Sequence, residues 1–375
     1  MREYALVLLI AAGVTYLLAG LCRRLAFRYN AVAIVRDRDV HTRPIPYFGG
    51  IAMLCGVAAA FLVASQLPWL GRFDLVEHDT RAVFLGSLVI CAVGVIDDKF
   101  DLNALAKIAG QILAAGIVVL NGVKVYWIPL PGTIISLDDA TSIALAVILI
   151  FLCVNAINLI DGLDGLAAGV VAIGSLAFFT YAYWLSYEQE LVRATTASLV
   201  TVVTVGVCLG FLPYNVHAAR MFMGDSGSML LGFLMSTSVI SLTGQLDPSQ
   251  IAVEGSGLAL NPYLPLILPF AVMALPLGDL ILAYVRRTIA GRLWFQADKQ
   301  HLHHRMLELG HSHRRAVALL WLWTALLAFG AVVIGMTSTA WAVVGLIAGI
   351  AIAAWLTWKP VRRGTAWARS RQPQR

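Results

Sequence analysis

The sequence predicts an all-α, polytopic integral membrane protein. Of its 375 residues, 59% are hydrophobic and only 13% are charged, and the mean hydropathy is +0.81. In soluble domains about a quarter of all residues are charged, so this composition excludes a water-soluble fold. The apolar residues also come in long runs, and a run of about 20 residues is enough to cross a bilayer as a helix.

Eleven apolar stretches are candidate membrane-spanning helices. They cover residues 4–22, 48–66, 82–96, 104–121, 142–157, 163–185, 195–212, 228–245, 263–285, 316–336 and 339–358. The first is expected to be a retained span, because its positive flank is too weak for a cleaved leader. The prolines of the ninth predict a bent or broken helix. No soluble segment interrupts the series, so we expect one transmembrane domain over residues 1–358 and a basic cytoplasmic tail over residues 359–375.

Lysine and arginine predict the orientation of these spans, since the cytoplasmic loops of membrane proteins carry an excess of both. With the N-terminus outside, most of the 27 lysines and arginines fall in the odd-numbered loops and in the C-terminal tail. The outside then keeps Arg2, Arg72, Arg81, Lys124 and Arg193. The odd-numbered loops and the C-terminus are therefore expected to be cytoplasmic.

Carboxylates and amides at the ends of two spans need a functional explanation. Asp97 and Asp98 end the third span in GVIDDKFDLNALAK, where two anions oppose the helix dipole and call for a cation or a proton. In VNAINLIDGLDGLAAG, residues 154–169, polar side chains recur every three residues and share a face wherever the chain is helical. These are Asn155, Asn158, Asp161 and Asp164. Such groups beside a span are costly unless they are paired with a ligand, a metal ion or water.

Three further stretches carry polar residues of interest. Asp225 in FMGDSGSMLLGF precedes the eighth span, where the segment either caps a helix or offers its amides to a phosphate. Arg43 lies in the stiff, proline-rich first loop, HTRPIPYFGG. His301, His303 and His304 follow the ninth span with a spacing that matches no common zinc signature, so we expect them to hydrogen bond to phosphate or carboxylate. His311 and His313 are expected to be bystanders.

All five stretches fall in odd-numbered loops, which predicts one site on the cytoplasmic face. A carboxylate cluster without thiolates suits a hard ion, Mg²⁺ or Mn²⁺, and magnesium often completes its shell with substrate phosphate. The site is therefore expected to carry out phosphoryl chemistry at the membrane surface. A cation or proton transporter is the alternative from another class, although its carboxylates should lie near the middle of the membrane.

The motifs together resemble those of the polyprenyl-phosphate N-acetylhexosamine-1-phosphate transferases. The resemblance covers about residues 41–315 and rests on IDD at 96–98, NAINLIDGLDGLAAG at 155–169, MGDSGS at 223–228 and HLHH at 301–304. It implies eleven spans with a cytoplasmic active site. The HLHH and HTRPIP segments resemble the N-acetylglucosamine branch, and Asp101 stands where the phospho-MurNAc-pentapeptide branch has a lysine. Ala297 departs from the proline that is common in the first of these branches.

The resemblance implies transfer of N-acetylglucosamine-1-phosphate from UDP-GlcNAc to undecaprenyl or decaprenyl phosphate, with release of UMP, as the first membrane step of cell-envelope glycan synthesis. The runner-up is a phospho-MurNAc-pentapeptide transferase. The implied location is the bacterial inner membrane. The expected partners are the lipid bilayer and, as an option, a second copy of the chain, and no nucleic acid is expected.

The resemblance also assigns roles to residues. Asp97, Asp98 and Asp164 are expected to be catalytic, and Asp225 to bind Mg²⁺ or Mn²⁺ together with Asp97 and Asp98. The residues expected to bind substrate are Arg43, Lys107, Asn155, Asn158, Asp161, His301, His303, His304 and Arg305.

Overall fold

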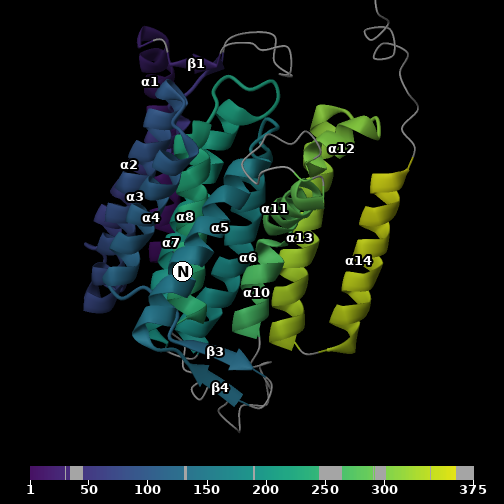
Figure 1. Ribbon diagram of the computed structural model, residues 1–375. Helices are drawn as coiled ribbons and strands as arrows, with labels where there is room; N and C mark the ends of the chain where they lie inside the picture. Colours follow the sequence, from purple (N-terminus) through teal and green to yellow (C-terminus); the bar gives the residue numbers. More distant parts are fainter. Residues whose placement is uncertain are drawn as a thin grey trace, which may run out of the picture.

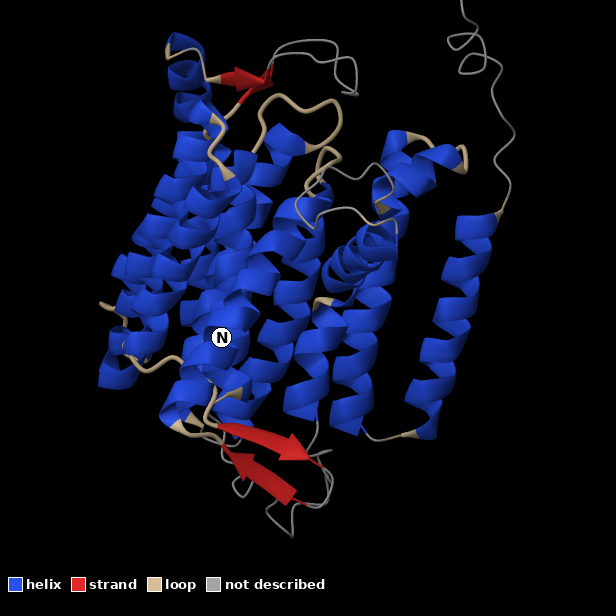
Figure 2. Ribbon diagram, viewed as in Figure 1, coloured by secondary structure: helices blue, strands red, loops and turns tan. Residues whose placement is uncertain are grey.

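The computed structural model describes residues 1–29, 31–33, 45–130, 133–188, 191–244, 264–289, 291, 301–337 and 339–359. This part of the chain is almost entirely helical, which confirms the predicted fold class (Figures 1 and 2). The helices are α1 (Arg2–Arg28), α2 (Gly49–Ala64), α3 (Asp74–Phe100), α4 (Ala104–Leu120), α5 (Asp139–Ile160), α6 (Leu166–Glu188), α7 (Val192–Asn215), α8 (Gly224–Thr243), α10 (Leu264–Val272), α11 (Ala274–Ile289), α12 (Leu302–Glu308), α13 (His313–Thr337) and α14 (Ala340–Trp358).

Eight of the helices in the described ranges are long and apolar enough to cross a membrane: α1, α3, α5, α6, α7, α8, α13 and α14. The apolar helices α2 and α4 are shorter. The ninth predicted span is broken at Met273 into α10 and α11, with Pro269 in the first piece and Pro276 in the second. Because proline removes a helical hydrogen bond, the predicted break is confirmed with its expected cause. Each predicted range thus overlaps a helix, and the chain is a multi-pass membrane protein.

Helix α8 lies at the centre of the bundle, where it packs against α2, α3, α5 and α7. Its first turn is rich in small residues, Gly224, Ser226 and Gly227, which allow neighbouring helix backbones to come close. At the crossing with α3, a Cβ atom on Gly94 would lie 2.3 Å from Cα of Ser226. A larger residue at Gly94 would therefore push apart the two helices that carry Asp97, Asp98 and Asp225.

The two ends of the bundle carry different extra elements (Figure 1). At one end lie α12 and the short ribbon of β1 (Val32–Ala33) and β2 (Ile45–Pro46). At the opposite end lies the hairpin of β3 (Trp127–Leu130) and β4 (Thr133–Ser136), which joins α4 to α5. A 3₁₀ turn over Leu70–Arg72 precedes α3. The predicted tail lies outside the described residues from position 360 onward.

Gly224 is expected to be intolerant of a side chain. Its φ angle is +70°, and a Cβ atom there would lie 2.3 Å from Oδ2 of Asp98. Gly224→Ala should therefore lower the melting temperature of the detergent-purified protein, since backbone strain of this kind costs about 1–3 kcal/mol. Gly116→Ala is the matched control, because nothing lies within 4 Å of a Cβ atom at Gly116 in α4. Equal melting temperatures for the two variants would contradict this account.

Candidate active site

Asp98, at the end of α3, caps the start of α8. Its Oδ1 accepts a hydrogen bond from the backbone N–H of Asp225 at 2.7 Å. Its Oδ2 accepts from the N–H of Ser226 at 3.3 Å and from the Ser226 hydroxyl at 3.0 Å. Met223, the residue before α8, makes no side-chain cap of its own. The amides at this helix start are therefore already satisfied by Asp98, so the cap explains the segment better than a phosphate site does.

Lys107 of α4 joins two carboxylates that come from different helices. Its Nζ donates to Oδ2 of Asp97 at 2.8 Å and to Oδ2 of Asp225. The other oxygen of Asp225 accepts from the amide of Asn158 at 2.9 Å, and the same amide donates to Ser228 at 2.9 Å. Helices α3, α4, α5 and α8 thus meet through charged and amide groups at one point.

The segment between α5 and α6 brings Asp161 and Asp164 to the same end. Burial, together with the nearby carboxylates of Asp225, Asp98 and Asp164, raises the pKa of Asp161 well above its usual range. Asp164 instead accepts from Nδ1 of His217 at 2.9 Å and from the N–H of Ala219 at 3.1 Å. These bonds tie the segment to the chain that leads into α8.

The histidine motif lies against this segment. A Cβ atom on Gly162 would lie 2.4 Å from Nε2 of His303, so only glycine leaves room for that ring. Burial, reinforced by His304 and His301, lowers the pKa of His303 to about 3. At pH 7 its imidazole is therefore neutral and offers one donor and one acceptor. His301 is buried, whereas Arg305 is exposed.

The donor set fits a divalent cation. Asp97 and Asp225 share Lys107, and the nearby carboxylates of Asp225 and Asp98 add to burial in raising the pKa of Asp161. Carboxylate oxygens are the ligands that Mg²⁺ and Mn²⁺ prefer. Asp98 holds the start of α8 with both oxygens, whereas Asp97 and Asp225 each bond to the side chain of Lys107, which can move away. Asp97, Asp161 and Asp225 are therefore the candidate ligands.

A second group of possible ligands comprises Asp164, His217 and His313, whose ligand atoms lie within 4.8 Å of one another. The two imidazole rings are stacked, with centroids 4.3 Å apart and planes inclined by 24°. Stacked rings direct their in-plane lone pairs side by side, whereas tetrahedral metal ligation needs them to converge. Hydrogen bonding suits this group better.

Most of the predicted site residues that fall in the described ranges gather at this end. Asn155 does not, because its amide donates to Gln111 at 2.9 Å and to the carbonyl of Phe151 at 2.7 Å, inside the bundle. Arg43 lies outside the described residues. His313 lies nearer to the predicted site than expected, since its ring stacks on His217 beside Asp164, and its role as a bystander stays a prediction. His311 bonds to the carbonyl of Thr357 and stays apart, as expected.

Three structural partners were not predicted from the sequence. His217 and Asn215 both lie in the predicted loop between the seventh and eighth spans. That loop was already expected to be cytoplasmic, so its other polar residues could have been included among the candidates. Asn215 accepts from the N–H of Gly165 at 2.9 Å and donates to the carbonyl of Met221 at 3.1 Å. Asp279 in α11 bonds to His301 and Leu302, and no sequence spacing connects it to them.

Comparison with known proteins gives the family. The model of "Glycosyl transferase family 4" matches residues 80–243, which hold Asp97, Asp161, Asp164 and Asp225. A decaprenyl-phosphate N-acetylglucosaminephosphotransferase of Mycolicibacterium smegmatis is 46% identical over 335 residues, 88% of this chain and 82% of that one. The chain belongs to the polyprenyl-phosphate N-acetylhexosamine-1-phosphate transferase family. Its members are phosphotransferases, so a transporter no longer competes as an explanation of the site.

Two more distant relatives differ in the group that their names say they transfer. A probable undecaprenyl-phosphate N-acetylglucosaminyl 1-phosphate transferase of Bacillus subtilis is 31% identical over 326 residues, 87% of this chain and 83% of that one. A phospho-N-acetylmuramoyl-pentapeptide-transferase of Desulforudis audaxviator is 29% identical over 342 residues, 84% of this chain and 93% of that one. The higher identity to the M. smegmatis protein agrees with the branch that the HLHH and HTRPIP motifs indicate.

Proposed function

We propose that this protein transfers N-acetylglucosamine-1-phosphate from UDP-GlcNAc to a polyprenyl phosphate. An oxygen of the acceptor phosphate forms a bond to the β-phosphorus of the donor. The bond from that phosphorus to the oxygen bridging the two phosphates breaks, and UMP leaves with this oxygen. The products are polyprenyl-diphospho-GlcNAc and UMP.

One observation carries the proposal: Lys107 bridges Asp97 and Asp225 at the point where α3, α4, α5 and α8 meet. A lysine between carboxylates can exchange these partners for phosphate oxygens when substrate binds, while a cation takes up the carboxylates. Mg²⁺ or Mn²⁺, when bound, would supply positive charge to the pyrophosphate as UMP leaves. A lysine that binds phosphate oxygens and carboxylates that hold a cation are the groups that phosphoryl transfer needs.

The surrounding residues have distinct tasks in this proposal. Asp225 is the first candidate ligand for the cation, and Asn158 holds its second oxygen in place. Asp97 orients the acceptor phosphate through Lys107. The neutral imidazole of His303 offers a hydrogen bond to a phosphate or sugar oxygen next to Gly162. His304 and Arg305 lie on the same short helix and are proposed to assist it.

A lipid acceptor also suits the surroundings of the site. An apolar pocket begins at Ile160, next to Asp161, and includes Leu302 and His303 of the histidine motif. Isoprenoid carbons adjacent to the acceptor phosphate would lie against the apolar side chains around this small pocket. Decaprenyl phosphate is the first acceptor to test, because the identity is 46% to a decaprenyl-phosphate enzyme and 31% to an undecaprenyl-phosphate enzyme.

The proposed location is the bacterial inner membrane, with the site on its cytoplasmic face. The sidedness of lysine and arginine supports this orientation, and so does the chemistry, because a nucleotide-activated sugar is a soluble donor. The opposite end, with the β3–β4 hairpin, would then face outward (Figure 1).

The donor decides between the two branches of the family. Detergent-purified protein supplied with Mg²⁺ and decaprenyl phosphate should release UMP from UDP-GlcNAc and not from UDP-MurNAc-pentapeptide. Release from the pentapeptide donor alone would move the protein to the other branch. Ion flux in liposomes without nucleotide, together with no UMP release from either donor, would remove the proposed function.

A further inference from the structure

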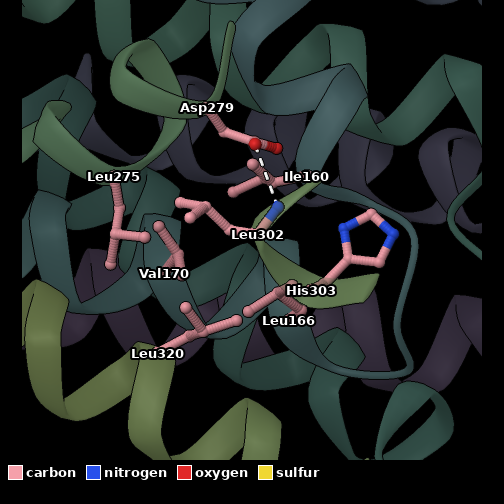
Figure 3. Close-up of a pocket in the computed structure, with 8 residues that line it drawn as sticks. All are labelled: Ile160, Leu166, Val170, Leu275, Asp279, Leu302, His303 and Leu320. Carbon is pink, nitrogen blue, oxygen red and sulfur yellow. Dashed lines mark hydrogen bonds between the residues drawn. The ribbon is translucent and has the colours of Figure 1, made fainter. Parts of the chain in front are cut away.

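Asp279 of α11 is a fully buried carboxylate that none of the roles above uses. It lies in the second piece of the broken ninth span. Its Oδ2 is 3.1 Å from Nδ1 of His301, and its Oδ1 accepts from the backbone N–H of Leu302 at 3.0 Å. Figure 3 shows this second bond at the rim of the apolar pocket, with His303 beside it. Both oxygens are therefore directed at the start of the histidine motif.

Helix α12 depends on this contact for its position. It has seven residues, and His301, which precedes it, makes no side-chain cap. A helix this short has little stability of its own, and the amides of its first turn lack partners within the helix. Asp279 supplies one of these partners from another helix, in a setting where an unpaired amide would be costly.

Asp279 also fixes which nitrogen of His301 carries a proton. A carboxylate only accepts hydrogen bonds, so Nδ1 of His301 must be protonated to make the bond. Nε2 is then left for another partner. The same helix seats His303 against Gly162, so the position of α12 determines how both histidines approach the Asp161–Asp164 segment.

We propose that Asp279 is a positioning residue for the transfer reaction: it holds the start of α12 and the tautomer of His301, so that the histidine motif faces the carboxylate cluster. The inference rests on the proposed function. It also accounts for a carboxylate in a broken span without ion transport, because its two oxygens bond to His301 and to Leu302 at the start of α12 rather than line a pathway.

A double-mutant cycle tests whether Asp279 acts through His301. Asp279→Ala should lower kcat for UMP release by about 10- to 100-fold, by analogy with the loss of a hydrogen-bond partner that orients a metal-ligating histidine. His301→Ala should lower it at least as much. In the His301→Ala background, Asp279→Ala should cost less than it does in the wild type, because Asp279 then holds only the N–H of Leu302 and no longer orients His301. Additive losses would overturn the proposal, and so would a wild-type kcat in Asp279→Ala.

Asp279→Asn separates positioning from folding. Asparagine can still accept from the N–H of Leu302, but its amide donor would face Nδ1 of His301. His301 should therefore move its proton to Nε2, which ¹⁵N NMR of histidine-labelled protein detects, with His301→Gln identifying the signal. We expect kcat to fall while the melting temperature stays near that of the wild type. Asp79→Asn, which neutralises another buried aspartate at the far end of α3, should change neither.

The NMR measurement keeps the inference separate from the proposed function. If the wild type releases no UMP, the proposed function fails, whereas the tautomer of His301 still reports on Asp279. A proton on Nδ1 in the wild type and on Nε2 in Asp279→Asn would support the positioning role. The same tautomer in both proteins would overturn it.

Discussion

Replacing Asp225 by asparagine is expected to lower the rate of UMP release by more than about 100-fold, since even residues that only orient a metal ligand contribute 10- to 100-fold. The two side chains have the same shape, so the bundle should stay folded. What is lost is the negative charge between Lys107 and Asn158. A carboxylate attracts a divalent cation far better than an amide does, so the concentration of Mg²⁺ needed for half-maximal rate should rise.

The measurement is UMP release as a function of Mg²⁺ concentration, with Mn²⁺ in a parallel series. Asp139→Asn is a matched control, because Asp139 also pairs with a lysine, Lys124, but does so exposed at the hairpin end of the bundle. That variant should keep the wild-type rate and the wild-type Mg²⁺ requirement. If Asp225→Asn behaved in the same way, Asp225 would not be the metal ligand.

The helices were predictable because a helix that crosses the bilayer needs about 20 consecutive, mostly apolar residues. Each of the eleven apolar stretches overlaps a helix, and the prolines of the ninth mark its break at Met273. The β3–β4 hairpin and α12 were not predicted. Both are short and lie outside the apolar runs, so no length requirement reveals them. Their positions depend on contacts with distant residues, such as the bond of Asp279 to Leu302.

The site was partly predictable for a related reason: charged residues beside apolar runs are rare, so they attract attention. Their partners were not predictable. Asp98 and Asp225 are 127 positions apart, and His217 and Asp164 are 53 apart. Loop parity placed these segments at one end of the bundle but could not say which side chains touch. The pairing depends on helix rotation, which the sequence alone does not give.

Asp97 and Asp98 illustrate this limit. Adjacent residues on a helix point about 100° apart, so two identical side chains acquire different neighbours. Asp97 turns toward α4 and meets Lys107, whereas Asp98 turns toward α8 and meets the amides of Asp225 and Ser226. The sequence gives the pair the same expected roles, catalytic and metal-binding, and these remain predictions. The contacts place Asp97 against Lys107 and Asp98 against the start of α8, which it supports.

Replacing Asp98 by alanine should therefore destabilise the protein as well as slow it. The change leaves the N–H groups of Asp225 and Ser226 without partners, and each unsatisfied buried donor costs about 1–3 kcal/mol. The melting temperature should fall clearly. The rate of UMP release should fall by about 100-fold, because the start of α8 carries Asp225 and a displacement of about 1 Å at such a group costs that much.

Asp97→Ala is the matched comparison, because it separates loss of rate from loss of stability. It removes one partner of Lys107 and the acceptor of the N–H of Leu102, but leaves the lysine paired with Asp225. The rate should fall strongly, while the melting temperature should fall less than in Asp98→Ala, which leaves two backbone N–H groups without partners. Asp98→Asn should recover part of the stability lost in Asp98→Ala, because its oxygen can still accept from the N–H of Asp225. If Asp98→Ala were as stable as the wild type but inactive, Asp98 would act on the substrates or the cation directly, and the support of α8 would fall to other residues.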